Sequence, residues 1–115
     1  MIESIIASPE VVHYICKRFD IKMSKKLGQN FLIKRGIVDE IVKAADLQEG
    51  EPVLEIGPGI GTLTQGLAQS GANVTAIELD TRLLEVLDTT LAQYSNVTIV
   101  HGLSLIHISE PTRPY

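Results

Sequence analysis

Apolar residues along this chain of 115 residues form two kinds of pattern, short continuous runs and stripes at helical spacing. The runs at 53–56, 73–77 and 97–100 are rich in branched side chains and are typical of buried parallel strands. The stripes lie before the first run and between the runs, which predicts helices there. The order is that of consecutive βαβ units, so the pattern predicts an α/β fold with three parallel strands, one half of a doubly wound sheet.

Four helices are expected. The first has Ser8 as its cap and Pro9 in its first position. The second covers 36–45, and its apolar stripe is expected to pack on the sheet. The third covers 62–69 and stops at a Ser-Gly pair, and the fourth runs from 81 to about 93. The stripe of the fourth helix is expected in the core and consists of Leu83, Leu84, Leu87 and Leu91.

A glycine-rich loop, Gly57-Pro58-Gly59-Ile60-Gly61, directly follows the first strand. Glycines there let the chain turn sharply and approach a ligand closely. Glu78 ends the second strand, where a carboxylate can accept both hydroxyl protons of a ribose. Thr62 stands where a dinucleotide fingerprint has its last glycine, which argues against NAD or FAD. The pattern predicts a nucleoside site; for the loop alone, a tight turn in an unrelated α/β protein is the alternative.

Upstream lies the segment Lys25-Lys26-Leu27-Gly28-Gln29-Asn30-Phe31-Leu32. With it, the chain resembles the ribosomal RNA adenine dimethyltransferases, which use S-adenosylmethionine. In that family a Gly-Gln-Asn-Phe-Leu segment closes over the methionine end of the cofactor, a Glu-x-Gly-x-Gly-x-Gly loop underlies it, and an Ile-Glu-x-Asp strand end holds the ribose. All three occur here in order. The resemblance favours the branch that modifies small-subunit (16S) ribosomal RNA, and it implies the N-terminal half of a Rossmann-like methyltransferase fold.

The resemblance also implies which residues bind the cofactor. Asn30 and the backbone of Leu32 would contact the methionine portion, although from the residues alone Asn30 reads as a polar loop residue. Glu55 would contact the ammonium group, but an acid at that place can instead fix the loop by accepting backbone amide protons. The full expected set is Gln29, Asn30, Leu32, Glu55, Gly57, Gly59, Gly61 and Glu78.

The reaction that the resemblance implies is transfer of two methyl groups to the exocyclic amine of adenine. That amine is a poor nucleophile, so the enzyme must mainly hold it in line with the sulfonium methyl group. The family's Asn-[Leu/Ile]-Pro-Tyr motif, which supplies those contacts, does not occur in this sequence, so no catalytic residue is assigned and the chain as written is expected to be inactive. The alternatives are a noncatalytic nucleoside- or RNA-binding module and a methyltransferase for another nucleic acid or a small molecule.

The net charge of -4 hides an asymmetry. Residues 17–35 carry seven basic side chains against one acid, whereas residues 36–102 carry ten acids against two basic side chains. A basic arm suits attraction to the phosphates of small-subunit ribosomal RNA or a pre-ribosomal subunit; a solvated lysine face is the alternative. The expected RNA-contacting residues are Lys22, Lys25, Lys26, Lys34 and Arg35.

Composition, with 44% hydrophobic and 21% charged residues, fits a small globular domain. The sequence has neither a membrane-length apolar run nor a signal-peptide pattern, and its single cysteine suits neither an internal disulfide nor a zinc site. A cytoplasmic monomer without a metal is expected.

The last stretch, 103–115, departs from the family, which has an acidic loop after the third strand. It resembles the conceptual translation of a transposase adapter used in sequencing libraries; a genuine divergent end is the alternative. The expected organisation is a helix and basic, cofactor-closing arm in 1–35, the N-terminal half of a methyltransferase domain in 36–102 and a non-native tail in 103–115.

Overall fold

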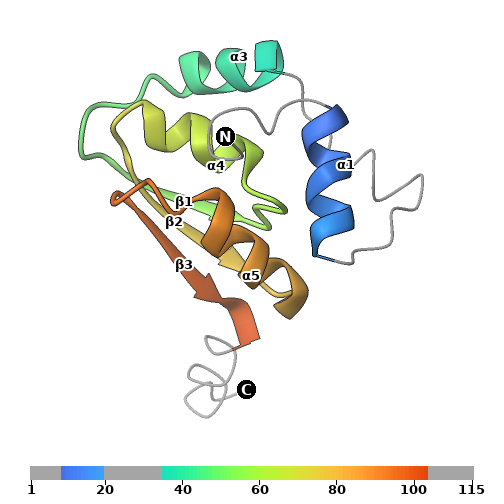
Figure 1. Cartoon of the computed structure of the whole chain (residues 1–115). Coiled ribbons are helices and arrows are strands. Elements are labelled where there is room, and N and C mark those ends of the chain that lie inside the picture. The colour runs from blue at the N-terminus through green and yellow to red at the C-terminus, as the bar shows by residue number, and fades with distance from the viewer. Residues whose placement is uncertain (1–8, 20–34, 104–115) are drawn as a thin grey trace, which may run out of the picture.

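The computed structural model describes residues 9–19 and 35–103, and it contains three parallel strands with helices before and between them (Figure 1). The strands pair side by side in the order β1-β2-β3. This arrangement confirms the predicted α/β class. The helices are α1 (Pro9–Arg18), α3 (Arg35–Ala45), α4 (Thr62–Gln69) and α5 (Thr81–Thr90), and the strands are β1 (Pro52–Ile56), β2 (Asn73–Glu78) and β3 (Val97–His101).

The strand register gives the sheet two different faces, because successive side chains of a strand point to opposite sides. On the face that we call inner, α4 and α5 pack against β2, and α5 also packs against β3. Val74 and Ala76 of β2 are fully buried there. On the other face, here called outer, Leu54 and Ile56 of β1 are 62% and 68% exposed. Apolar residues therefore line both faces of β1, while α4 and α5 cover the inner one.

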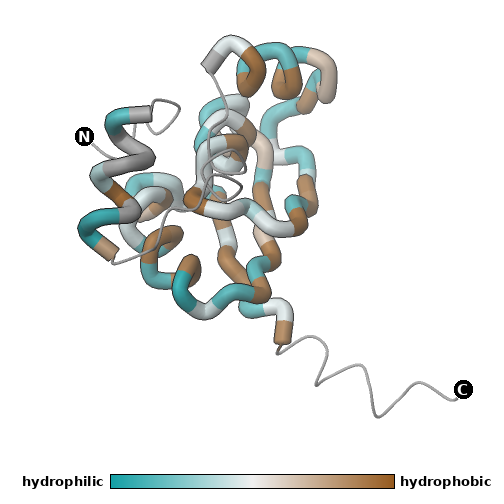
Figure 2. The backbone as a smooth tube through the Cα atoms, turned by 90° about the vertical axis from the view of Figure 1, so that its right-hand side faces the viewer, coloured by the Kyte–Doolittle hydropathy of each residue, from teal (hydrophilic) through white to brown (hydrophobic). Residues whose placement is uncertain are grey.

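The core on the inner face is built from small and branched side chains. Leu67 of α4 packs with Ala72 and Val74, and the side chains of Val42 and Leu47 add to this cluster from the α3 side. Figure 2 shows the corresponding alternation of hydrophobic and hydrophilic segments along the backbone. The predicted leucine stripe of α5 is confirmed as core: Leu83, Leu87 and Leu91 are buried and Leu84 is half-buried.

Helix α3 packs differently from the prediction, which placed its apolar stripe on the sheet. Its main contact is α4, over which it lies in Figure 1. The two helices approach closely because Gly66 has no side chain: a Cβ atom there would lie 2.5 Å from Val38 Cγ1. Val38 is buried, whereas Ile37 and Ile41 of the same stripe are exposed. The expectation therefore holds only in part: Val42 packs against the cluster that contains Val74 of β2, but the main contact of this helix is α4.

Helix α5 has well-defined ends. Asp80 caps its start by accepting a hydrogen bond from the backbone N–H of Arg82 at 3.0 Å, as short acidic residues do at helix N-termini. It ends at Thr90, three residues before the predicted end, and Leu91 serves as its cap. The apolar periodicity continues to Leu91, whose side chain is buried beyond the last helical residue. Of the helices in the described part, none is both long and apolar enough to span a membrane.

Candidate functional site

The glycine-rich loop leaves the carboxyl end of β1 beside the end of β2. The N–H of Gly57 donates to the carbonyl of Ile77 at 2.9 Å, so the ladder between the two strands continues into the loop. Gly57, Gly59 and Gly61 have φ angles of 68°, 64° and 96°, in the left-handed region that glycine adopts without strain. The loop thus needs its glycines for backbone shape, as the sequence predicts.

The first and last glycines differ in what surrounds them. A Cβ atom added to Gly57 would have no neighbour within 4 Å, so its free side faces open space. A Cβ atom added to Gly61 would lie 3.0 Å from the hydroxyl oxygen of Thr90 and 3.3 Å from Leu87 Cδ2. Gly57 therefore leaves room for a ligand, whereas Gly61 allows the loop to pack against α5.

Glu78 is 6% exposed and holds the loop and the following turn together. Its Oε1 accepts a hydrogen bond from the N–H of Gly59 at 3.3 Å, and its Oε2 accepts one from the N–H of Asp80 at 2.9 Å. These bonds fix the carboxylate at the tip of β2, next to the loop. His101 is its register partner on β3, and within the described ranges His101 Nε2 is buried without a hydrogen-bond partner.

Glu55 lies near the carboxyl end of β1 and does not bind the backbone amides of the loop. Its Oε1 accepts a hydrogen bond from Thr64 Oγ1 at 2.6 Å, and residues 9–19 and 35–103 donate no backbone amide proton to it. Burial raises the pKa of Glu55, and the hydrogen bond from Thr64 opposes that rise. The alternative considered for Glu55, capture of loop amides, is thus a role that the structure gives to Glu78.

A set of buried polar side chains, not expected from the sequence, joins the loop to α5 and α5 to α4. Thr90 Oγ1 donates to the carbonyl of Ile60, and Gln65 Nε2 donates to the carbonyl of Thr90, both at 2.9 Å. Thr62 Oγ1 is also buried, and it lacks a partner among the described residues. Polar residues on otherwise apolar helix faces are the available signal, because buried polar groups are normally hydrogen-bonded.

Most of the upstream residues expected at the site lie outside the described ranges. The structure gives Arg35 only as the first residue of α3. The positions outside are Lys22, Lys25, Lys26, Gln29, Asn30, Leu32 and Lys34.

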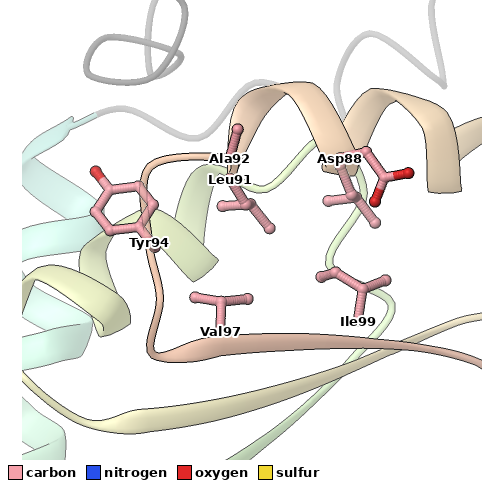
Figure 3. Close-up of a pocket in the computed structure, with 7 residues that line it drawn as sticks. Asp88, Leu91, Ala92, Tyr94, Val97 and Ile99 are labelled. Carbon is pink, nitrogen blue, oxygen red and sulfur yellow. The ribbon is translucent and has the colours of Figure 1, made fainter.

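A hollow of about 310 Å³ lies elsewhere, between the second half of α5 and the start of β3. Figure 3 shows Val97 and Ile99 pointing from β3 toward α5, with Val97 opposite Leu91, while the carboxylate of Asp88 points outward. Val97 begins β3, whereas the loop adjoins the carboxyl ends of the strands, so this hollow is not the nucleoside site predicted from the loop. The described ranges contain no cluster of three or more His, Cys, Asp or Glu side chains able to hold a metal.

The parallel sheet, the glycine turn and the acidic strand tip are the features of a nucleoside-binding α/β domain. Solved structures narrow the class to methyltransferases with a Rossmann-like fold. The 23S rRNA methyltransferase ErmE matches with a TM-score of 0.57 and 37% identity, over 61% of this chain and 29% of that one. Coclaurine N-methyltransferase, bound to N-methylheliamine and SAH, matches with a TM-score of 0.53 and 27% identity, over 57% of this chain and 21% of that one.

Sequence comparison identifies the family within that class. The model for ribosomal RNA adenine dimethylase matches residues 20–105. A protein of Bacillus pumilus named Ribosomal RNA small subunit methyltransferase A is 49% identical over 96 residues, which cover 84% of this chain and 33% of that protein. The chain belongs to the ribosomal RNA adenine dimethylase family. It spans about a third of the length of the curated relatives it matches.

Proposed function

We propose that this chain forms the cofactor-binding part of an S-adenosylmethionine-dependent dimethyltransferase that modifies adenines of small-subunit (16S) ribosomal RNA. Family membership and the names of the curated relatives support the reaction and its substrate. The observation that carries the proposal is the buried carboxylate of Glu78, held beside the glycine loop. A nucleoside cofactor needs such an acceptor at its ribose.

The side chains have separate tasks in this proposal. Each oxygen of Glu78 has a lone pair beyond the one used by Gly59 or Asp80, and these lone pairs accept hydrogen bonds from the ribose hydroxyls. The open side of Gly57 lets the methionine portion lie against the backbone. The carboxylate of Glu55 accepts a hydrogen bond from the ammonium group. The bound cofactor supplies an electrophilic methyl group on its sulfonium, and the protein holds it in place.

Cofactor binding is tested by isothermal titration calorimetry of the chain with S-adenosylhomocysteine, the demethylated product. We expect Glu78→Gln to weaken binding at least about tenfold, because hydrogen bonds to a charged acceptor are lost. Glu85→Gln, at an exposed acid of α5, is the matched control and should leave affinity unchanged. Absence of binding to the unaltered chain, or equal effects of the two substitutions, would contradict the proposal.

The RNA partner is tested through the salt dependence of binding to unmethylated small-subunit ribosomal RNA. Residues 20–34 carry most of the expected phosphate contacts, and each contact that is lost should lower the slope of log affinity against log salt by about 0.7 to 0.9. We expect Lys25→Gln with Lys26→Gln to lower it by about 1.5. Lys43→Gln, an exposed basic residue of α3, is the control. An unchanged slope in the double variant argues for a solvated lysine face.

Methyl transfer by the chain itself is a separate matter. The family's Asn-[Leu/Ile]-Pro-Tyr motif does not occur in the sequence, so we expect cofactor binding without transfer of labelled methyl groups to RNA. Detectable transfer would show that other residues of this chain position the adenine amine. We also propose that a protein of the relatives' full length acts as a monomer in the cytoplasm.

A further inference from the structure

The hydrogen bond between Thr64 and Glu55 connects the two ends of the glycine loop. Glu55 precedes the loop on β1, and Thr64 follows it in the first turn of α4. The donor oxygen of Thr64 lies 2.6 Å from Glu55 Oε1, and Thr64 is fully buried. A bond this short is typical of a hydroxyl that donates to an ionised carboxylate. One oxygen of Glu55 is therefore fixed in place by a side chain that solvent does not reach.

The other oxygen of Glu55 has no donor among the residues that the structure describes. Burial disfavours the charged form of a carboxylate, and such a group is normally matched by a cation. Within the described ranges no basic side chain forms an ion pair with Glu55, and the guanidinium of Arg82 pairs with Asp80 at 2.7 Å. A half-buried acid beside a loop with open space over Gly57 can obtain its cation from a bound ligand.

We propose that Thr64 is a positioning residue for the amino-acid end of the cofactor: its hydroxyl holds one oxygen of Glu55 so that the other accepts a hydrogen bond from the ligand's ammonium group. This inference rests on the proposed function and extends it to a residue with no expected ligand contact. The simpler role for Thr64 is a buried hydroxyl that only stabilises the loop. If Thr64 positions Glu55, its removal weakens binding of the amino-acid end of a ligand only. If Thr64 only stabilises the loop, its removal weakens binding of the nucleoside end as well.

Two ligands separate these roles, because S-adenosylhomocysteine carries the amino-acid end and 5′-methylthioadenosine lacks it. We expect Thr64→Val, which keeps the shape and removes the hydroxyl, to weaken binding of S-adenosylhomocysteine about tenfold. Binding of 5′-methylthioadenosine should change less than about twofold, since it has no ammonium group for Glu55. Thr64→Ser keeps the hydroxyl and should bind S-adenosylhomocysteine as the unaltered chain does. The control is Thr89→Val, at a half-buried threonine of α5.

Glu55→Gln supplies a second measurement that does not depend on removing the buried hydroxyl. Its amide oxygen can still accept from Thr64, but it offers the ammonium group no charge, so it should also weaken S-adenosylhomocysteine selectively. Adding Thr64→Val to Glu55→Gln should then cause little further loss, because residues that act as a unit are not additive.

The outcomes distinguish this inference from the proposed function. If the unaltered chain binds S-adenosylhomocysteine and Thr64→Val weakens both ligands equally or neither, Thr64 is structural and the inference alone fails. Independent, additive effects of the two substitutions would also overturn it. If the unaltered chain binds neither ligand, the proposed function fails as well.

Discussion

Strand β1 takes part in two surfaces of opposite character. On its inner side Glu55 meets Thr64 of α4, and the loop that follows is tied to β2 and to α5. On its outer side Leu54 and Ile56 are more than half exposed. Adjacent residues of β1 thus differ in their surroundings: Glu55 lies in a hydrogen-bonded polar region, whereas Leu54 and Ile56 lie on an exposed apolar face. The comparison shows that the hydrogen bonds around the loop join residues that are close in sequence, all between Glu55 and Thr90.

The largest effect should come from breaking the packed end of the loop. Gly61→Ala places a Cβ at a φ of 96°, close to Thr90 and Leu87, so backbone strain and overlap act together. We expect a loss of about 3 kcal/mol in the free energy of unfolding, measured by urea denaturation. The matched change is Gly57→Ala, which meets open space and should lose only about 1 kcal/mol through its backbone conformation. Equal losses would mean that Gly61 does not hold the loop against α5.

The two faces of the sheet should also differ in sensitivity to truncation. Val74→Ala removes two methyl groups from a fully buried position and should lower the free energy of unfolding by about 2 kcal/mol. Leu54→Ala, on the outer face, removes more atoms from an exposed position and should cost less than about 0.5 kcal/mol. A large loss for Leu54→Ala would indicate that the outer face is covered in solution.

The outer face should instead control self-association. Exposed apolar patches and open strand edges promote association between molecules, so we expect Ile56→Lys to weaken self-association about tenfold in sedimentation velocity. Leu79→Lys introduces the same charge at an exposed leucine beyond the end of β2 and serves as the control. If both variants behave alike, added charge rather than the outer face of β1 determines the result.

The smallest effect concerns pH and the inner side of β1. Burial raises the pKa of the Glu55 carboxyl above its ordinary value of 4.5, so the folded chain binds a proton at Glu55 more tightly than the unfolded chain does. The stability due to protonated Glu55 is present below 4.5 and is lost as the pH rises through the raised pKa. Glu55→Gln should remove that loss and raise the free energy of unfolding near neutral pH by less than about 1 kcal/mol. Glu40→Gln, at an exposed acid of α3, should show no such change.

The fold was predictable from the sequence where the signal is local. The apolar runs marked all three strands within one residue, and the glycines marked the turn after β1. The packing partner of α3 was not predictable, because the stripe that contains Val38 fits a helix as well as a sheet. The end of α5 was overestimated because Leu91 continues the periodicity after the helix has ended.

The ligand contacts expected at the candidate site remain predictions, but the structure shows how two of its acids are held. The place of Glu78 at a strand tip was predictable from the apolar run before it, whereas its hydrogen bond to the loop at Gly59 was not. The choice between roles for Glu55 depended on a donor nine residues away, which spacing alone does not identify. Likewise, no motif distinguishes Gly57, which faces open space, from Gly61, which faces α5.

The bonds from Thr90 to Ile60 and from Gln65 to Thr90 have a consequence for the energetics of ligand capture. They join the loop to α5 and α5 to α4 without a ligand, so the backbone of the loop is already ordered. A flexible loop of this length would lose conformational entropy at the moment of binding, at a cost of roughly 1 kcal/mol or more for each residue fixed. Here that entropy is lost during folding instead. More of the interaction with an incoming nucleoside can therefore appear as affinity, and the ligand should enter a prepared surface rather than shape one.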